Sequence, residues 1–179
     1  SSPGKWPLSD KLFVLACIGT FLLLTLPTLP GSFSVDELSM VTVFQGPVTF
    51  EKLLIFRGEE HPLALRITNF MLPLSGGKEW IMRLPFLAVT AAGIPVFFAL
   101  MRKIVGRYVA RVAIALLAIN FFLVMCGPTL RAYAFLHTFG LASSLAFLCL
   151  LRREGKGDFA SGASLALFSA LGIYAQPLF

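Results

Sequence analysis

The sequence predicts an all-α fold: a polytopic bundle of membrane-spanning helices with amphipathic helices at its surface. Three observations support this. Of the 179 residues, 57% are hydrophobic and only 13% are charged, whereas about 25% of residues are charged in a soluble domain. Apolar stretches recur at lengths that can cross a hydrocarbon core about 30 Å thick. Short basic runs separate several of these stretches, as is typical of cytoplasmic loops.

The first predicted span covers residues 12–29. At a rise of about 1.5 Å per residue, a helix of this length crosses the hydrocarbon core. Lys5 and Lys11 precede the span, and Trp6 lies where an aromatic residue is expected at the interface. Basic residues remain preferentially on the cytoplasmic side, so we expect the N-terminus to be cytoplasmic. Pro30 ends the span.

A polar loop, residues 30–83, follows and is expected to carry short helices. Residues 34–37 read S-x-x-E, the pattern of a capping box that opens a helix. A second short helix is predicted over residues 49–57, and a third begins at Pro62 and ends before Gly76. The third helix has one apolar stripe, which predicts an amphipathic helix lying on the membrane surface. The stripe consists of Leu63, Ile67, Phe70 and Leu74.

Further spans are predicted at residues 84–101, 112–126, 133–151 and 159–177. With the N-terminus inside, the basic turns between alternate spans fall in the cytoplasm, where acidic residues are few. In the loops assigned to the outside, acidic and basic residues balance. This asymmetry places the 30–83 loop outside the cytoplasm. The chain lacks an initiating Met and ends within or just past an apolar stretch, so we expect it to be a fragment of a longer chain.

Charge and cysteine content exclude other classes of protein. The formal net charge is +6, but the basic residues lie in predicted turns, which indicates membrane topology and not nucleic-acid binding. Cys17, Cys126 and Cys149 are scattered through apolar stretches, with neither the spacing of metal ligands nor that of a disulfide framework. We interpret them as small buried hydrophobic residues.

Carboxylates and a histidine stand at the two ends of the 30–83 loop. Asp36 and Glu37 follow the first span, and Glu60 and His61 lie near the end of the loop. Acidic groups beside a bilayer are costly and are often functional. Two readings stay open for Asp36 and Glu37: a catalytic pair, or acids that only favour a helix N-terminus. Glu60 and His61 are either site residues or ordinary solvated loop residues.

Two arginines and a second histidine have similar alternatives. Arg83 and Arg131 lie at the predicted outer membrane face. They either bind an anionic group there or extend to lipid headgroups. His137 lies within the fourth predicted span, and we interpret it as an interhelical hydrogen-bonding residue in preference to a ligand-binding one.

The order of these motifs resembles the N-terminal half of a GT-C glycosyltransferase of the dolichyl-phosphate-mannose protein mannosyltransferase type, which includes the bacterial aminoarabinose transferases. The resemblance extends over nearly the whole chain, although each motif alone is short. The matching motifs are Asp36-Glu37, His61-Pro62-Leu63, Arg83-Leu84-Pro85, Gly106-Arg107, Leu116-Leu117-Ala118 and Arg131-Ala132-Tyr133.

The resemblance implies an inverting transfer of a sugar from a polyprenyl-phosphate donor to a glycan, lipid or protein acceptor. The transfer would occur on the extracytoplasmic face of a bacterial plasma (inner) membrane or of an ER-type membrane. Asp36 matches the catalytic base, and Glu37 is its neighbour in the site. Glu60 matches a position that helps to bind a divalent metal in some members. The predicted donor-phosphate ligands are His61, Arg83, Arg131 and Tyr133, and Arg66 is a further candidate.

The sequence also departs from the family pattern. Thr129 stands where members often have an acid, a single proline follows His61, and Tyr174-Ala175-Gln176 replaces a Y-x-H motif. These departures keep an alternative open, in which the chain is a non-catalytic relative that acts as a binding or assembly subunit. A transporter-like bundle is a further alternative, but its ionisable groups would be expected within the spans and not in an outer loop.

Overall fold

The computed structural model describes residues 6–34, 37, 41, 61–152 and 159–175. Every element in these ranges is a helix, which confirms the predicted all-helical fold. The helices are α1 (Leu8–Thr25), η1 (Leu26–Thr28), α4 (Pro62–Ser75), α5 (Glu79–Ile104), α6 (Arg107–Ala118), α7 (Phe121–Cys126), α8 (Tyr133–Arg152) and α9 (Phe159–Ala175). The short helix predicted over residues 49–57 lies outside the described residues.

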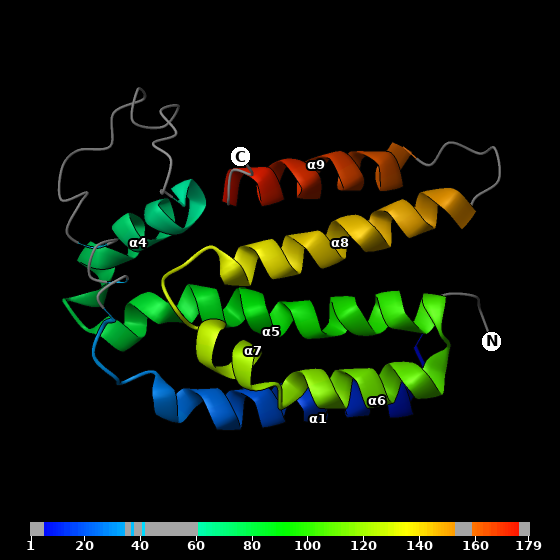
Figure 1. Cartoon of the computed structure of the whole chain (residues 1–179), viewed down its shortest axis with the longest axis horizontal. Coiled ribbons are helices and arrows are strands. Elements are labelled where there is room, and N and C mark those ends of the chain that lie inside the picture. The colour runs from blue at the N-terminus through cyan, green and yellow to red at the C-terminus, as the bar shows by residue number, and fades with distance from the viewer. Residues whose placement is uncertain (1–5, 35–36, 38–40, 42–60, 153–158, 176–179) are drawn as a thin grey trace.

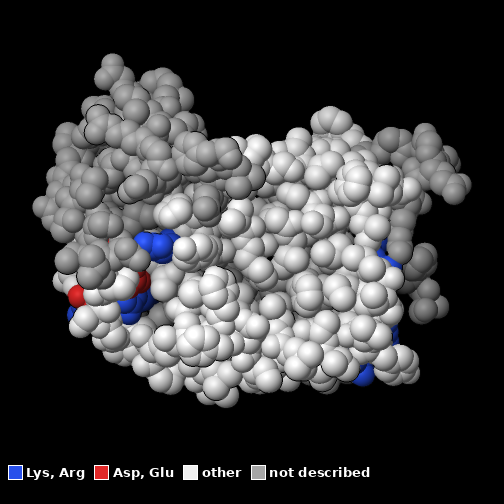
Figure 2. Space-filling view, in the orientation of Figure 1, with Lys and Arg blue, Asp and Glu red and all other residues white. Residues whose placement is uncertain are grey.

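The long helices run side by side between two ends of the molecule (Figure 1). Helix α5 is central: it packs against α1 and α6 on one side and against α8 on the other, and α9 packs against α8. We call the end that holds residues 6–11 and 102–111 the basic end. The opposite end, which holds residues 26–34, 61–83 and 127–133, is the site end. In Figure 2 the charged side chains gather at these two ends, and the middle of the face shown is uncharged.

Three of the helical stretches are long and apolar enough to cross a membrane: Leu8–Thr28, Glu79–Ile104 and Tyr133–Leu151. Their surfaces carry large exposed apolar side chains such as Leu15, Leu23 and Phe147, which suit contact with lipid and not with water. The chain is therefore an integral membrane protein. Helix α9 is apolar but shorter, and the side of the membrane that each end faces stays a prediction.

The stretch predicted as one span over residues 112–126 differs from the expectation, because it contains two helices. Helix α6 ends at Ala118, and α7 begins at Phe121. Between them the side chain of Asn120 accepts a hydrogen bond from the backbone N–H of Leu123 at 3.1 Å. This N-cap starts a new helix and so competes with continuation of the first one.

Helix α4 begins and ends where the sequence predicts. Its last residue is followed by Gly76 in the left-handed conformation, with φ of 57°, which favours glycine. The four residues of the predicted apolar stripe differ in burial. Leu63 and Ile67 are partly buried against the core, while Phe70 and Leu74 are exposed. The placement of α4 on a membrane surface stays a prediction.

The core has two parts. One joins α1, α5 and α6 through fully buried Phe21, Phe98 and Ile114. The other lies beneath the site end, where Phe86 of α5 meets Phe135 of α8 with ring centroids 5.2 Å apart. This second cluster fixes the start of α5 against the start of α8, and so sets the base on which the polar residues of the site end stand.

Close packing between α5 and α8 depends on Gly93. A Cβ atom at this position would lie 2.8 Å from Oγ1 of Thr138 and 3.1 Å from Nδ1 of His137. Small residues allow membrane helices to approach in this way. The Thr138 hydroxyl donates to the carbonyl of Val89 at 2.9 Å. Thr138 thus makes the interhelical hydrogen bond that we predicted for His137, whose Nδ1 is buried without a partner among the described residues.

Candidate functional site

A buried ion pair between Arg83 and Glu37 is the centre of the site end. The Nε of Arg83 donates to Oε1 of Glu37 at 3.1 Å, and its Nη2 donates to Oε2 at 2.8 Å. The two residues are only 6% and 2% exposed. A two-point contact of this kind fixes direction as well as charge. It attaches the loop after α1 to the second turn of α5.

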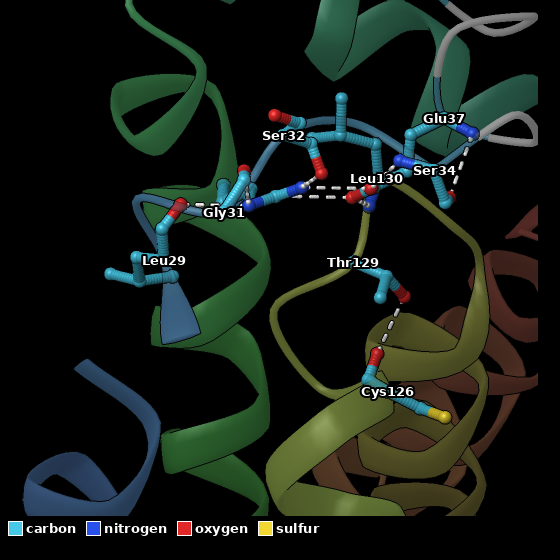
Figure 3. A network of polar contacts seen from close by, with 9 residues as sticks. Leu29, Gly31, Ser32, Ser34, Glu37, Cys126, Thr129 and Leu130 are labelled. Carbon is cyan, nitrogen blue, oxygen red and sulfur yellow. Dashed lines mark hydrogen bonds and ion pairs between the residues drawn. The ribbon is translucent and has the colours of Figure 1, made fainter. Parts of the chain in front are cut away.

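The remaining N–H groups of Arg83 bind the same loop. Its Nη1 donates to the carbonyls of Leu29 and Gly31, each at 2.7 Å, and its Nη2 donates to the carbonyl of Ser32 at 3.2 Å. Figure 3 shows the loop that carries these carbonyls around the guanidinium group. A guanidinium has five N–H donors, and these contacts with those to Glu37 engage all five.

Glu37 joins three segments of the chain. Its Oε2 accepts from the backbone N–H of Ser34 at 2.9 Å, while the Glu37 N–H donates to Oγ of Ser34 at 3.3 Å. These reciprocal bonds confirm the predicted capping box. Its Oε1 also accepts from the backbone N–H of Leu130 at 3.1 Å. Burial alone would raise the pKa of the Glu37 carboxyl, but the hydrogen bonds from Arg83, Ser34 and Leu130 lower it below its ordinary value.

The contacts of Arg83 and Glu37 change the roles that we assign to them. The sequence predicted Glu37 as a catalytic residue and Arg83 as a donor-phosphate ligand. The structure brings them together, but onto each other and onto the backbone, so that Arg83 has no N–H left for a phosphate. We therefore assign both to positioning the loop that contains Asp36. Asp36 itself and Glu60, the predicted base and metal ligand, lie outside the described residues.

The second group of predicted ligands lies around Arg131. Its Nη1 donates to the hydroxyl of Tyr133 at 3.3 Å, and its guanidinium lies 5.9 Å from the centroid of that ring. His61, directly before α4, is half-buried, and its Nδ1 has no hydrogen-bond partner among the described residues. Burial lowers the pKa of His61, and the charge of Arg131 lowers it further. The structure thus brings His61 within electrostatic reach of Arg131.

A pocket of about 230 Å³ opens between the loop after α1 and the turn before α8. Four hydroxyl-bearing residues and the Arg83–Glu37 pair are among its lining residues, although most of the lining surface is apolar. Thr129, which stands at the position where the family often has an acid, is one of these residues, and its hydroxyl donates to the carbonyl of Cys126 at 2.7 Å. The lining residues are Thr28, Gly31, Ser32, Ser34, Glu37, Arg83, Met125, Pro128 and Thr129.

One contact at this end was not predicted from the sequence. The Nε of Arg66 in α4 donates to the hydroxyl of Tyr174 in α9 at 2.7 Å. The sequence indicated Arg66 as a candidate phosphate ligand, and Tyr174 as part of the segment that differs from the Y-x-H motif of the family. It gave no reason to pair the two residues. The hydrogen bond links the amphipathic helix to the last described helix.

No group of three or more His, Cys, Asp or Glu side chains among the described residues has an arrangement that would hold a metal ion. A metal site that includes Glu60 stays a prediction, because that residue is not described. The roles of Arg131 and His61 as phosphate ligands stay predictions.

Together, these features define a polytopic membrane protein with a buried polar network and a pocket at one end of its helices. The chain belongs to the dolichyl-phosphate-mannose-protein mannosyltransferase family, because the sequence model of that family matches residues 59–177, more than half of the chain. This confirms the family resemblance seen in the sequence. Searches of curated proteins and of solved structures found no match.

The matched range contains His61, Arg83, Arg131 and Tyr133, and it begins after Asp36. The family is one of membrane glycosyltransferases, so glycosyl transfer is the activity that membership suggests. The roles of individual residues do not follow from the match and are argued below.

Proposed function

We propose that this membrane glycosyltransferase moves a sugar from a polyprenyl-phosphate donor to an acceptor hydroxyl on the extracytoplasmic face, with inversion at the anomeric carbon. The observation that carries the proposal is the Arg83–Glu37 pair, which holds Glu37, the residue that follows Asp36, against the turn before α8. Both residues of the pair also line the pocket described above. This network therefore fixes Glu37, the sequence neighbour of the proposed base.

In this proposal Asp36 is the general base. Its carboxylate takes the proton of the acceptor hydroxyl, and the acceptor oxygen attacks the anomeric carbon from the face opposite the phosphate. The bond between the anomeric carbon and the phosphate oxygen breaks, and polyprenyl phosphate leaves with both electrons of that bond. The sugar thus becomes attached to the acceptor with inverted configuration, and the proton remains on Asp36 until solvent removes it.

Arg131 and His61 would compensate the charge of the leaving phosphate. Charge-assisted contacts to phosphate oxygens are strong, and stabilising the charge that develops on a leaving group lowers the barrier. Tyr133 would orient Arg131 through the hydrogen bond described above. The resemblance also implies a divalent metal near Glu60 in some members. Among the described residues, no three His, Cys, Asp or Glu side chains are placed to hold a metal ion together. We therefore route no step through a metal.

One observation favours a second candidate function, that of a non-catalytic binding subunit. Thr129 occupies the position where the family often has an acid, and its hydroxyl is engaged with Cys126. To separate the two functions, the intact membrane protein is supplied with a radiolabelled polyprenyl-phosphate sugar, and both bound donor and transferred label are measured. Transfer supports the enzyme. Donor binding with no transfer to glycan, lipid or protein acceptors would favour the binding subunit.

A further inference from the structure

At the basic end, opposite the proposed active site, three arginines surround a single buried carboxylate. Asp10, in the first turn of α1, is fully buried. Its Oδ1 accepts from Nε of Arg107 at 2.8 Å and from Nη2 of Arg111 at 2.6 Å. Nη1 of Arg102, in the last turn of α5, lies 3.9 Å from its Oδ2. We call these four residues the Asp10 cluster.

The Asp10 cluster carries an excess of positive charge. One carboxylate faces three guanidinium groups, and in the described part of the chain it is the acid ion-paired with them. Arg107 is also the first residue of α6, where the helix dipole disfavours a cation. Placing an arginine there on structural grounds alone costs free energy. A second anion bound to the cluster would offset that cost.

The arginines retain hydrogen-bonding capacity toward such an anion. Arg107 uses Nε for Asp10 and Nη2 for the hydroxyl of Ser9, and Arg111 uses Nε and Nη2 for Asp10. The Nη1 groups of Arg107 and Arg111 make no hydrogen bond to another described residue. The side chains of the three arginines are 25% to 36% exposed. Asp10 thus holds them from inside, while their outer edges reach the surface.

The surroundings of the cluster indicate where the anion comes from. Exposed apolar residues lie next to it in sequence, on α1, at the end of α5, on α6 and on the turn between α5 and α6. Figure 2 shows basic atoms at this edge beside the uncharged middle of the molecule. Such a border is where acyl chains end and headgroups begin. These apolar residues are Leu8, Leu12, Ile104, Val105, Tyr108, Val109 and Val112.

We propose that Arg102, Arg107 and Arg111 bind the phosphate of an anionic phospholipid headgroup, with Asp10 holding the three guanidinium groups in position. One guanidinium group can donate two parallel hydrogen bonds to a phosphate group. Basic pockets between membrane helices bind anionic headgroups. The neighbouring apolar surface would accept the acyl chains. This favours a lipid over a free phosphate ion.

The test uses the intact protein in detergent, titrated with short-chain phosphatidylglycerol, phosphatidylcholine or inorganic phosphate, with binding followed by native mass spectrometry. The main variant is Arg102→Gln, because the long contact of Arg102 with Asp10 makes it the arginine whose loss costs the fold least. We expect tight binding of phosphatidylglycerol alone, and an affinity loss of about tenfold or more in Arg102→Gln. The matched control is Lys11→Gln, which removes the same charge from an exposed residue of the same end and should change affinity by less than about twofold.

Three results would overturn the proposal: unchanged phosphatidylglycerol binding in Arg102→Gln, an equal loss in Lys11→Gln, or inorganic phosphate binding as tightly as the lipid. The second would indicate diffuse charge, and the third a site for a free anion. If Arg102→Gln does not fold, Arg102→Lys replaces it. That variant keeps the charge but not the planar fork, and must still bind the lipid more weakly than wild type.

Discussion

The guanidinium of Arg83 and the carboxylate of Glu37 lie 2.8 Å apart across 46 residues of sequence. Each is nearly inaccessible to solvent. The energetics of such a pair are asymmetric, because removing one partner leaves the other charge buried and unpaired, whereas removing both does not. The pair therefore contributes to holding residues 29–34 against α5.

This asymmetry gives the first prediction. Arg83→Met should destabilise the protein by about 3–5 kcal/mol, because Glu37 then stays buried without its partner. The double variant Arg83→Met, Glu37→Leu should recover a large part of that loss. Unfolding in detergent, followed by circular dichroism, gives the free energies of unfolding. Additive losses in the double variant would contradict the description of a coupled pair.

The second prediction concerns the contact of α5 with α8. Gly93→Ala places a methyl group 2.8 Å from Oγ1 of Thr138, so that Thr138 must move and weaken its bond to Val89. We expect a loss of about 1–3 kcal/mol. Gly140→Ala is the control, because nothing lies within 4 Å of a Cβ there and alanine favours a helix. An equally stable Gly93→Ala variant would refute the close approach of the two helices.

These examples also show what sequence reasoning can reach. The helices and their approximate ends follow from apolar composition, and the Ser34–Glu37 capping box follows from a local four-residue pattern. The Arg83–Glu37 pair does not, because nothing local to either residue specifies a partner in another segment. The predicted place of Arg83 at the outer membrane face, together with the family resemblance, suggested a phosphate ligand, whereas the structure shows its donors engaged by the protein.

Two features were missed although the sequence held a signal for each. Asn120 interrupts an apolar run, and a helix-capping residue there is a reason to expect two helices. Asp10 is an acid at the start of a predicted span, where a buried charge requires partners. In the sequence, Asp10 entered only the charge balance of the predicted cytoplasmic side. That balance gave no indication that distant arginines converge on it.

The third prediction tests the donor-phosphate role of Arg131. Arg131→Ala should weaken binding of the polyprenyl-phosphate sugar roughly tenfold to a hundredfold, because a charge-assisted contact contributes about 1.5–3 kcal/mol. Lys78→Ala is the control, since Lys78 is an exposed basic residue of the same end. Binding of labelled donor to the purified protein measures both. If the two variants lose the same small amount, Arg131 has no specific contact with the phosphate.

The fourth prediction uses the pKa of His61, which burial and Arg131 hold below its ordinary value of 6.5. At neutral pH the imidazole is therefore uncharged in the free protein. A bound phosphate favours its charged form, so that donor binding takes up a proton. Donor affinity should then increase as the pH falls from about 7.5 to below the ordinary pKa of histidine. His61→Gln should remove this dependence. A His61→Gln variant with the same pH profile as wild type would place the titrating group elsewhere.

The last prediction concerns Asp36. It directly precedes Glu37, whose carboxylate accepts four hydrogen bonds, from Ser34, Arg83 and Leu130. Glu37 makes the capping-box contact, so a capping role does not require the Asp36 side chain. As general base, Asp36→Asn should lower turnover about 10²–10⁴-fold and leave donor binding nearly unchanged. If Asp36 serves only at a helix start, Asp36→Asn should be almost silent, because asparagine serves there equally well.

The measurement is sugar transfer and donor binding side by side in the intact protein, with Glu79→Gln as a control that removes another carboxylate from the same end. Wild-type turnover in Asp36→Asn would exclude the base role, and a loss of donor binding as large as the loss of turnover would assign Asp36 to binding instead.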